Sequence, residues 1–455
     1  MNDRFDSTSH YRALDAAHHL HPFSDMAALN RAGSRVIAKA QGVYLLDTEG
    51  TRLIDGMAGL WCVNVGYGRR ELADAAFAQM QELPYYNTFF KTTHPPVVEL
   101  SSLLAQLTPF KRFLYCNSGS EANDTALRVV HRYWATQGKA QKHYVIARKN
   151  AYHGSTIAGA TLGGMSYMHE QMPSKVEHIV HIDQPYWYGE GGSMDEAGFG
   201  LERARQLEAK IIELGAENVA AFIGEPFQGA GGVIFPPSTY WAEIERICRK
   251  HNVLLIADEV IGGFGRTGEW FAHQHFGFKP DVMTMAKGLT SGYVPMGAVG
   301  LSDAIADAIS EGGEFNHGFT YSGHPVAAAV AIANLKLLRD EGIVEHVKRD
   351  SGPYFQARLR AALSDHPIVG EIAGVGLVAG IQLAQDPAIR KRFDNADDIG
   401  TLCRDFCFDD GLVMRASHDR MLLSPPLIIT HAEIDEMVTK AKAAIDATAR
   451  TLKLI

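Results

Sequence analysis

An aspartate and a lysine near the middle of the chain could together hold a reactive heterocycle. Asp258 follows the most apolar segment of the sequence, 253–257, where a buried carboxylate is costly without a cationic partner. Lys287 lies 29 positions further on, and a lysine amine can form an imine with an aldehyde and then act as a base. Taken singly, Asp258 is more typical of a turn cap and Lys287 of a surface lysine. Together they favour a site in which a protonated pyridine nitrogen faces Asp258 and the ring becomes an electron sink.

Three other segments place polar or aromatic side chains directly after apolar runs. Ser118, Gly119 and Ser120 open a predicted helix, whose free N–H groups and dipole favour an anion by about 0.3–1 kcal/mol, or up to ~2 when partly buried. Taken alone, these residues are better explained as a capping box with Glu121. The remaining two segments are Tyr152-His153-Gly154 and Glu225-Pro226.

A glycine pattern supports a rival function. Residues 263–268 read Gly-Phe-Gly-Arg-Thr-Gly, which matches the dinucleotide fingerprint G-x-G-x-x-G and would suit a nicotinamide-dependent dehydrogenase. The placement argues against it. Asp258 and Glu259 lie between the strand and the glycines and would repel a pyrophosphate, and no clear amphipathic helix follows. We therefore interpret 263–268 as a tight loop beside the site.

The elements that must position these residues alternate between short strands and helices. Helical stretches at 200–214 and 239–251 separate some of the strands, and this alternation predicts an α/β domain with a mostly parallel sheet. The side chains above would then meet at the carboxyl edge of that sheet. The predicted strands are 113–116, 144–147, 219–224, 253–257 and 282–285.

The two ends of the chain have a different pattern. Residues 43–47 and 51–55 read as a hairpin around a turn, and the tail mixes helical with strand-like segments. We expect an N-terminal arm and part of a small domain in 1–65, a large domain in 66–330 and a small α+β domain in 331–455. The tail segments are helices at 326–340, 341–364 and 431–452, and strand-like pieces at 373–383 and 411–424.

Bulk composition narrows the function classes. The chain has 455 residues, a net charge of −9 and no basic run, which argues against nucleic acid as a partner. No apolar run approaches the roughly 20 residues of a membrane span, and the first residues do not read as a signal peptide, so we expect a cytoplasmic protein. His18, His19 and His21 could form a metal site, but three histidines with no evident carboxylate or thiol partner are more typical of a solvated arm, so we expect no metal. Five cysteines, an odd number, do not suggest a disulfide framework: Cys62, Cys116, Cys248, Cys403 and Cys407.

The order and content of the motifs resemble the class III pyridoxal-phosphate aminotransferases. The matching segments are 256–268, 286–288, 118–123, 152–154 and 225–226, and the resemblance extends over nearly the whole chain. It implies the aspartate-aminotransferase-like fold (fold type I), with pyridoxal 5'-phosphate bound by the large domain.

The resemblance also implies roles for individual residues. Lys287 is expected to link to the cofactor and shuttle a proton, and Asp258 to pair with the pyridinium nitrogen. Tyr152 and Val260 are expected on the two ring faces, and Glu225 is expected to support Asp258. Ser118, Gly119 and Ser120 are expected at the phosphate, and Thr320 is expected to reach the phosphate in the partner subunit of a homodimer, which could pair into a tetramer.

Within the family, the chain is most similar to the amine:pyruvate transaminases, which include putrescine- and β-alanine-using enzymes. An aromatic substrate pocket would suit a donor without an α-carboxylate, and Arg415 matches the family's carboxylate-binding arginine. We therefore expect a ping-pong transfer from an amine to pyruvate, giving alanine and an aldehyde or ketone. An aminomutase or a decarboxylase would use the same cofactor site. The expected substrate-binding residues are Phe23, Leu60, Trp61, Phe89, Tyr152 and Arg415.

Overall fold

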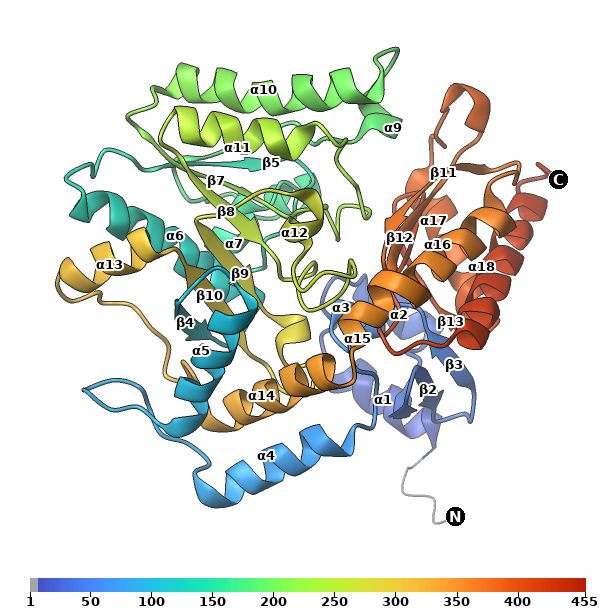
Figure 1. The fold of residues 1–455 in the computed structure, drawn as a ribbon. Helices are drawn as coiled ribbons and strands as arrows, with labels where there is room; N and C mark the ends of the chain where they lie inside the picture. The colour runs from blue at the N-terminus through green and yellow to red at the C-terminus, as the bar shows by residue number, and fades with distance from the viewer. Residues whose placement is uncertain (1–6) are drawn as a thin grey trace.

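A seven-stranded sheet forms the centre of the molecule in the computed structural model, which describes residues 7–455 (Figure 1). Its strand order is β4-β10-β9-β8-β7-β5-β6. Strands β9, β8, β7, β5 and β6 run parallel, and β10 is inserted antiparallel between β9 and β4. The carboxyl ends of all strands except β10 therefore share one edge. The strands are β4 (Arg112–Cys116), β5 (Tyr144–Arg148), β6 (Ile179–Ile182), β7 (Val219–Gly224), β8 (Leu254–Asp258), β9 (Val282–Met285) and β10 (Gly297–Leu301).

Helices cover both faces of this sheet, so its central strands are buried throughout. Every residue of β7 and β8 is buried, as expected for parallel strands between helical layers. The buried face of α6 packs on one side of the sheet, whereas α10 and α11 pack on the other. The helices of this part are α4 (Arg70–Glu82), α5 (Pro95–Leu107), α6 (Gly119–Thr136), α7 (Ile157–Leu162), α8 (Ser166–Glu170), α9 (Trp187–Glu190), α10 (Glu196–Leu214), α11 (Tyr240–Lys250), α12 (Ala272–Phe276), the 3-10 turn Lys287–Leu289 and α13 (Asp303–Glu311).

Two smaller sheets lie beside the central one. The first has the order β1-β2-β3-β13, and its parallel β3–β13 pair joins the two ends of the chain. The second is antiparallel, with the order β11-β12-β15-β14. Their strands are β1 (Ile37–Gln41), β2 (Tyr44–Asp47), β3 (Arg52–Asp55), β11 (Val369–Val375), β12 (Val378–Leu383), β13 (Leu412–Val413), β14 (Arg415–Ser417) and β15 (Arg420–Leu423).

The remaining helices lie at the two ends of the chain. Helices α16, α17 and α18 pack beside the β11-β12-β15-β14 sheet, while α14 packs against α4 and α5 (Figure 1). These helices are α1 (Thr8–His18), α2 (Met26–Ala32), α3 (Ala58–Trp61), α14 (Pro325–Asp340), α15 (Ile343–His346), the π-turn Val347–Ser351, α16 (Gly352–Leu363), the 3-10 turn Pro387–Ile389, α17 (Ala396–Asp409) and α18 (His431–Thr451).

The predicted elements differ from the structure mainly where strands are short. All five predicted strands of the central sheet are present, but β6 and β10 were not predicted. The segment 373–383 is a hairpin rather than one strand, because Gly376 turns the chain with a φ of 55°. A side chain at Gly376 would meet the carbonyl oxygen of Arg266 at 2.6 Å. The segment 411–424 divides into β13, β14 and β15, which belong to two sheets.

No helix within residues 7–455 combines the length and the apolar character that crossing a membrane would require.

Candidate active site

A cavity of about 140 Å³ lies at the carboxyl edge of the central sheet. It is bounded by segments that follow β4, β5, β7, β8 and β9, which is where the sequence places its reactive residues. Seven predicted cofactor residues line it, together with four residues that were not predicted. The lining residues are Gly119, Ser120, Asn123, Tyr152, His153, Gly154, Glu225, Asp258, Val260, Ile261 and Lys287.

Asp258 is a buried carboxylate that is held ionised by neighbouring donors. It is the last residue of β8, and its Oδ2 accepts hydrogen bonds from His153 Nδ1 at 2.7 Å and from Asn123 Nδ2 at 2.8 Å. The backbone N–H of Val260 donates to its Oδ1 at 3.0 Å. Burial alone would raise the pKa of Asp258, but the hydrogen bonds and the nearby His153 lower it overall. The carboxylate is therefore available to a cation in the cavity.

Lys287 brings an amine into the same cavity from the end of β9. The side chain is half-buried, and burial of the amine lowers its pKa, although Cys62 and Asp258 oppose this shift. The Lys287 backbone has a φ of 44°, a strained region for a non-glycine residue that concentrates at functional sites. A lysine whose pKa is lowered in this way supplies the neutral amine that a nucleophile or base needs.

The start of α6 forms one end of the cavity. Gly119 and Ser120 are in the first turn, where backbone N–H groups lack helical partners. The hydroxyl of Ser118 accepts a hydrogen bond from the N–H of Glu121 at 3.1 Å and so caps the helix. A side chain at Gly119 would come within 2.9 Å of Val260, so glycine keeps this end open. The capping interaction uses the Ser118 side chain and the N–H of Glu121, so it does not occupy the N–H groups of Gly119 and Ser120.

Aromatic and apolar groups enclose the middle of the cavity. Tyr152 and Val260 line it after β5 and β8 respectively. Glu225 follows β7, and its carboxylate accepts hydrogen bonds from the N–H groups of Tyr152 at 3.2 Å and Gly229 at 2.8 Å. Burial raises the pKa of Glu225. A flat ring could lie between Tyr152 and Val260, with Asp258 beyond one end and the α6 start beyond the other.

Five of the six predicted substrate residues lie at or beside this cavity, namely Tyr152, which lines it, and four residues around it. The Trp61 ring is buried, with its centroid 5.4 Å from Lys287 Nζ and 5.0 Å from Arg415 Cζ. The ring of Phe23 lies 6.3 Å from that of Tyr152, measured between centroids. Leu60 adjoins Trp61 and is exposed. Arg415 is half-buried, and within residues 7–455 no carboxylate forms an ion pair with it.

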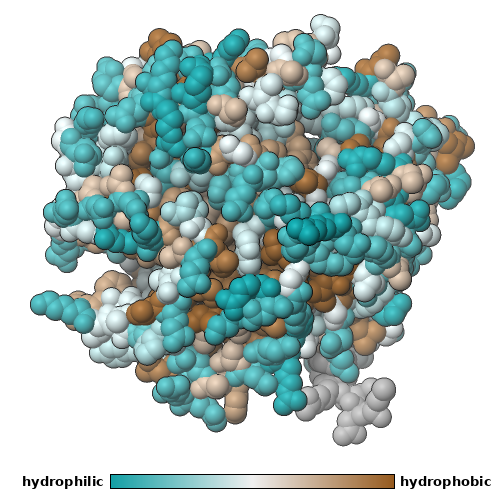
Figure 2. Space-filling model, in the orientation of Figure 1, coloured by the Kyte–Doolittle hydropathy of each residue, from teal (hydrophilic) through white to brown (hydrophobic). Residues whose placement is uncertain are grey.

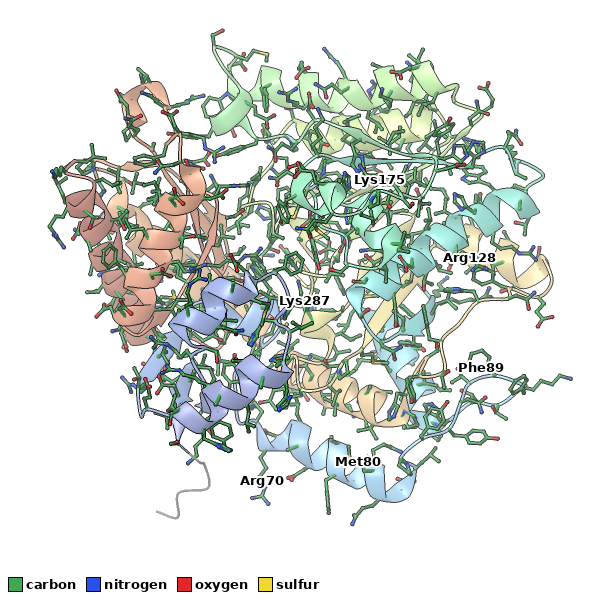
Figure 3. All side chains as sticks on the ribbon, turned by 180° about the vertical axis from the view of Figure 1, so that it is seen from behind. Arg70, Met80, Phe89, Arg128, Lys175 and Lys287 are labelled. Carbon is green, nitrogen blue, oxygen red and sulfur yellow. The ribbon has the colours of Figure 1, made fainter. Side chains whose placement is uncertain are left out.

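Phe89 and Thr320 are not near the cavity in the single chain. Phe89 lies on the loop between α4 and α5, away from Lys287 (Figure 3). Thr320 is exposed, and its carbonyl accepts a hydrogen bond from the hydroxyl of Tyr85 at 2.7 Å. A Cβ built on Gly318 would lie 3.0 Å from the Phe89 ring. The two residues therefore share one surface region, which we define by residues 85–90 and 318–321.

Two of the four lining residues that were not predicted support Asp258. His153 and Asn123 contact Asp258 directly, and Asn123 is oriented by the hydroxyl of Thr284, which donates to its Oδ1 at 2.9 Å. His153 adjoins Tyr152 in the motif, and this adjacency was the only available signal for it. Asn123 ends the matching segment 118–123, but no role was assigned to it, because its inward direction depends on how α6 packs on the sheet.

The glycine pattern at 263–268 forms a packed loop. Arg266 is fully buried, and its guanidinium donates to the carbonyls of Leu377 and Pro425 and to Oδ1 of Asn64. Burial lowers the pKa of Arg266 to about 9. The loop thus joins distant chain segments, and none of its residues lines the cavity, which removes the structural basis for a dinucleotide site here.

Comparison with known proteins decides the family. The family model described as Aminotransferase class-III matches residues 27–445. The chain belongs to the class III aminotransferases. It is therefore a pyridoxal-phosphate-dependent aminotransferase with an α/β fold, and the buried acid, the amine and the helix start of the cavity suit that cofactor.

Individual relatives agree with this assignment. The chain is 56% identical to a putrescine–pyruvate aminotransferase from Pseudomonas aeruginosa, over 97% of both chains. It is 40% identical to a diaminobutyrate–2-oxoglutarate transaminase from Halomonas elongata, over 95% of this chain and 93% of the relative.

Solved structures extend the likeness to the whole fold. An (S)-enantioselective omega-transaminase from Thermomicrobium roseum has a TM-score of 0.94 at 40% identity, covering 98% of this chain and 99% of the other. The omega-transaminase of Pseudomonas jessenii in complex with PMP has a TM-score of 0.93 at 37% identity, covering 96% and 98%.

Proposed function

We propose that this enzyme moves an amino group from a primary amine, such as a diamine or an omega-amino acid, to pyruvate. The products are alanine and an aldehyde or ketone, formed in two half-reactions at the same site. The position of Arg415 carries the proposal, since its guanidinium lies beside Trp61 with no carboxylate partner among the described residues. The 56% identity to a putrescine–pyruvate aminotransferase supports the same donor and acceptor classes.

Different residues of the cavity could bind the ring nitrogen, the phosphate and the ring faces of the cofactor. Asp258 would pair with the protonated ring nitrogen, and the N–H groups of Gly119 and Ser120 would hold the phosphate. Tyr152 and Val260 would lie on the two ring faces. When bound, pyridoxal phosphate supplies an electron sink and carries the amino group between the half-reactions.

Lys287 transfers the proton in both half-reactions. Its neutral Nζ can take the proton from the amine-bearing carbon of the substrate and return it at the acceptor carbon. Burial lowers the pKa of Lys287, which favours the neutral form of the amine. The Trp61 ring, 5.4 Å from Nζ, excludes water from this side of the site.

Arg415 binds the carboxylate of the keto acid. A guanidinium can form two parallel hydrogen bonds to a carboxylate, which fixes both distance and orientation. Burial lowers the pKa of Arg415, yet a guanidinium is not deprotonated in proteins and so keeps its charge at neutral pH. An amine donor without an α-carboxylate has no need of Arg415 and can use the aromatic wall instead.

Separate measurement of the half-reactions tests this assignment. Arg415→Ala should reduce kcat/KM for pyruvate by about 100-fold, equivalent to the roughly 2.7 kcal/mol of a lost charged pair. The first half-reaction with putrescine, followed by single-turnover absorbance, should change less than threefold. Equal losses in both half-reactions would contradict the assignment.

Product analysis separates the proposal from its nearest rivals. Putrescine, β-alanine and an aromatic amine are each supplied with pyruvate, and alanine is measured by mass spectrometry. An aminomutase or a decarboxylase would give product without pyruvate and would form no alanine.

We further propose that the enzyme is a homodimer through the surface defined by 85–90 and 318–321. Exposed aromatic side chains gather there, with Phe90 90% exposed and Tyr321 55% exposed. Apolar side chains also appear on the neighbouring face around α4 and α14 in Figure 2. Pairing of two such surfaces would cover these groups and would bring Phe89 and Thr320 towards the partner's cavity.

Light scattering tests the dimer. Phe90→Asp should shift the species from dimer towards monomer and reduce cofactor affinity, because the partner's Thr320 contact is lost. Ile212→Asp is the matched control, since Ile212 is 66% exposed on α10. A monomeric wild-type enzyme would refute the proposal.

A further inference from the structure

Two histidines and an aspartate meet on the N-terminal segment, outside the catalytic cavity. Asp15 lies in α1, His19 directly follows this helix, and His21 is two residues further on. The Oδ1 atom of Asp15 lies 3.0 Å from His19 Nδ1 and 2.9 Å from His21 Nε2. The ligand-type atoms of the three residues all lie within 4.8 Å of one another. The structure thus supplies the carboxylate partner that the histidines lacked in the sequence.

These donors match the preferences of a divalent transition-metal ion. Imidazole nitrogen and carboxylate oxygen bind Zn²⁺ at about 2.0–2.2 Å, so two such donors on a tetrahedral ion are about 3.3 Å apart. The observed 2.9 and 3.0 Å separations need to open by only a few tenths of an ångström. Small rotations of exposed side chains can provide that movement.

The Asp15 carboxylate is oriented before any ion arrives. The hydroxyl of Ser34 donates to Asp15 Oδ2 at 2.7 Å, the kind of outer hydrogen bond that fixes metal-binding carboxylates. The His19 side chain is 59% exposed, which leaves room for water as a further ligand.

We propose that Asp15, His19 and His21 form a binding site for a divalent transition-metal ion such as Zn²⁺. The ion would join the end of α1 to the segment that follows it, with water completing the coordination.

The site has a structural link to the active site. His21 is two residues before Phe23, whose ring lies 6.3 Å from that of Tyr152 at the cavity. Fixing His21 restricts the short connection to Phe23, which is 69% exposed and has a φ of 51°. Metal binding therefore orders an aromatic side chain at the cavity mouth. This consequence rests on the proposed function, whereas metal binding itself does not.

Titration with ZnCl₂ tests the site directly. The cofactor-loaded enzyme, freed of excess cofactor and metal, is titrated by calorimetry without substrate. We expect one Zn²⁺ per chain with a Kd on the order of micromolar, weakened at least tenfold in His19→Ala and in His21→Ala. His18→Ala is the matched control, because His18 is exposed and outside the cluster, and it should bind as the wild type does.

Comparison of the variants shows whether the ion occupies this cluster or another part of the chain. Absence of Zn²⁺ binding, or binding that is unchanged in His19→Ala and His21→Ala, would overturn the proposal. Co²⁺ provides a second readout, since its visible absorption bands should appear in the wild type and in His18→Ala but not in the His19→Ala/His21→Ala double variant. Bands retained in the double variant would place the ion elsewhere. These measurements involve no turnover, so their failure would leave the transaminase proposal untouched.

Discussion

At the scale of single residues, Lys287 carries the largest expected effect. Lys287→Ala removes the amine that we propose attaches the cofactor and moves the proton, so turnover should fall by at least about 1,000-fold, since acid–base catalysis alone contributes about 10²–10⁴. Lys175→Ala, at an exposed lysine, is the control. After borohydride reduction of the loaded wild type, peptide mass spectrometry should find a pyridoxyl group on the Lys287 peptide. A pyridoxyl group on another lysine would contradict the site.

The charge of Asp258 depends on His153, so the dependence of cofactor affinity on pH below neutrality should report on this contact. Asp258 has a lowered pKa, so its contribution to stability and cofactor binding is present above the pKa of the unfolded chain and is lost as pH falls through the folded pKa. His153→Ala removes a hydrogen-bond donor worth about 1.5–3 kcal/mol. Cofactor binding should therefore begin to weaken at a pH about 1–2 units higher than in the wild type.

Cofactor affinity measured against pH checks this effect. Asn123→Ala should shift the acid limb in the same direction, because Asn123 donates to the same oxygen. An acid limb that stays in place in both variants would show that Asp258 is held ionised by other groups.

At the scale of elements, Lys142 ties the α6–β5 connection to the neighbouring strands. It is buried, and its ammonium donates to the carbonyls of Ala216, Val219 and Asn252 at 2.8, 2.7 and 3.0 Å. Lys142→Ala leaves these three acceptors without a donor, so the free energy of unfolding should fall by about 3 kcal/mol. Denaturant unfolding measures it, with exposed Lys139→Ala as the control, expected within about 0.5 kcal/mol. Similar values for the two variants would refute the role of Lys142.

Strands with a clear local apolar pattern can be predicted from the sequence. Strands and side-chain contacts that depend on how the elements pack together cannot. Strands such as Val219–Gly224 are apolar throughout, and the residues after them are necessarily at one edge of a parallel sheet. Strand β10 is short, contains Gly297 and Gly300 and runs against its neighbours, so no motif marked it. The contact of His153 with Asp258 joins positions 105 residues apart. Such pairs follow only from the assembled sheet.

At the scale of the whole molecule, Arg420 connects the β11-β12-β15-β14 sheet to the active-site side of the chain. It lies in β15 and is buried, and its guanidinium donates to Glu371, to the hydroxyl of Tyr186 and to the carbonyls of Gly232 and Val233. Gly232 and Val233 lie in the same loop as Gly229, whose N–H donates a hydrogen bond to the carboxylate of Glu225 in the cavity. Arg420 is therefore expected to influence the position of Glu225 at a distance.

Arg420→Met should destabilise the protein by about 3–5 kcal/mol, because Glu371 is left as a poorly compensated charge. The double variant Arg420→Met/Glu371→Gln removes that charge and should recover part of the loss, which denaturant unfolding measures as a double-mutant cycle. Both variants lack the donor to the Gly232 carbonyl, so cofactor affinity should stay reduced in both even as stability returns. If affinity recovered together with stability, Arg420 would act only through overall stability, and the proposed link through Gly229 to Glu225 would be wrong.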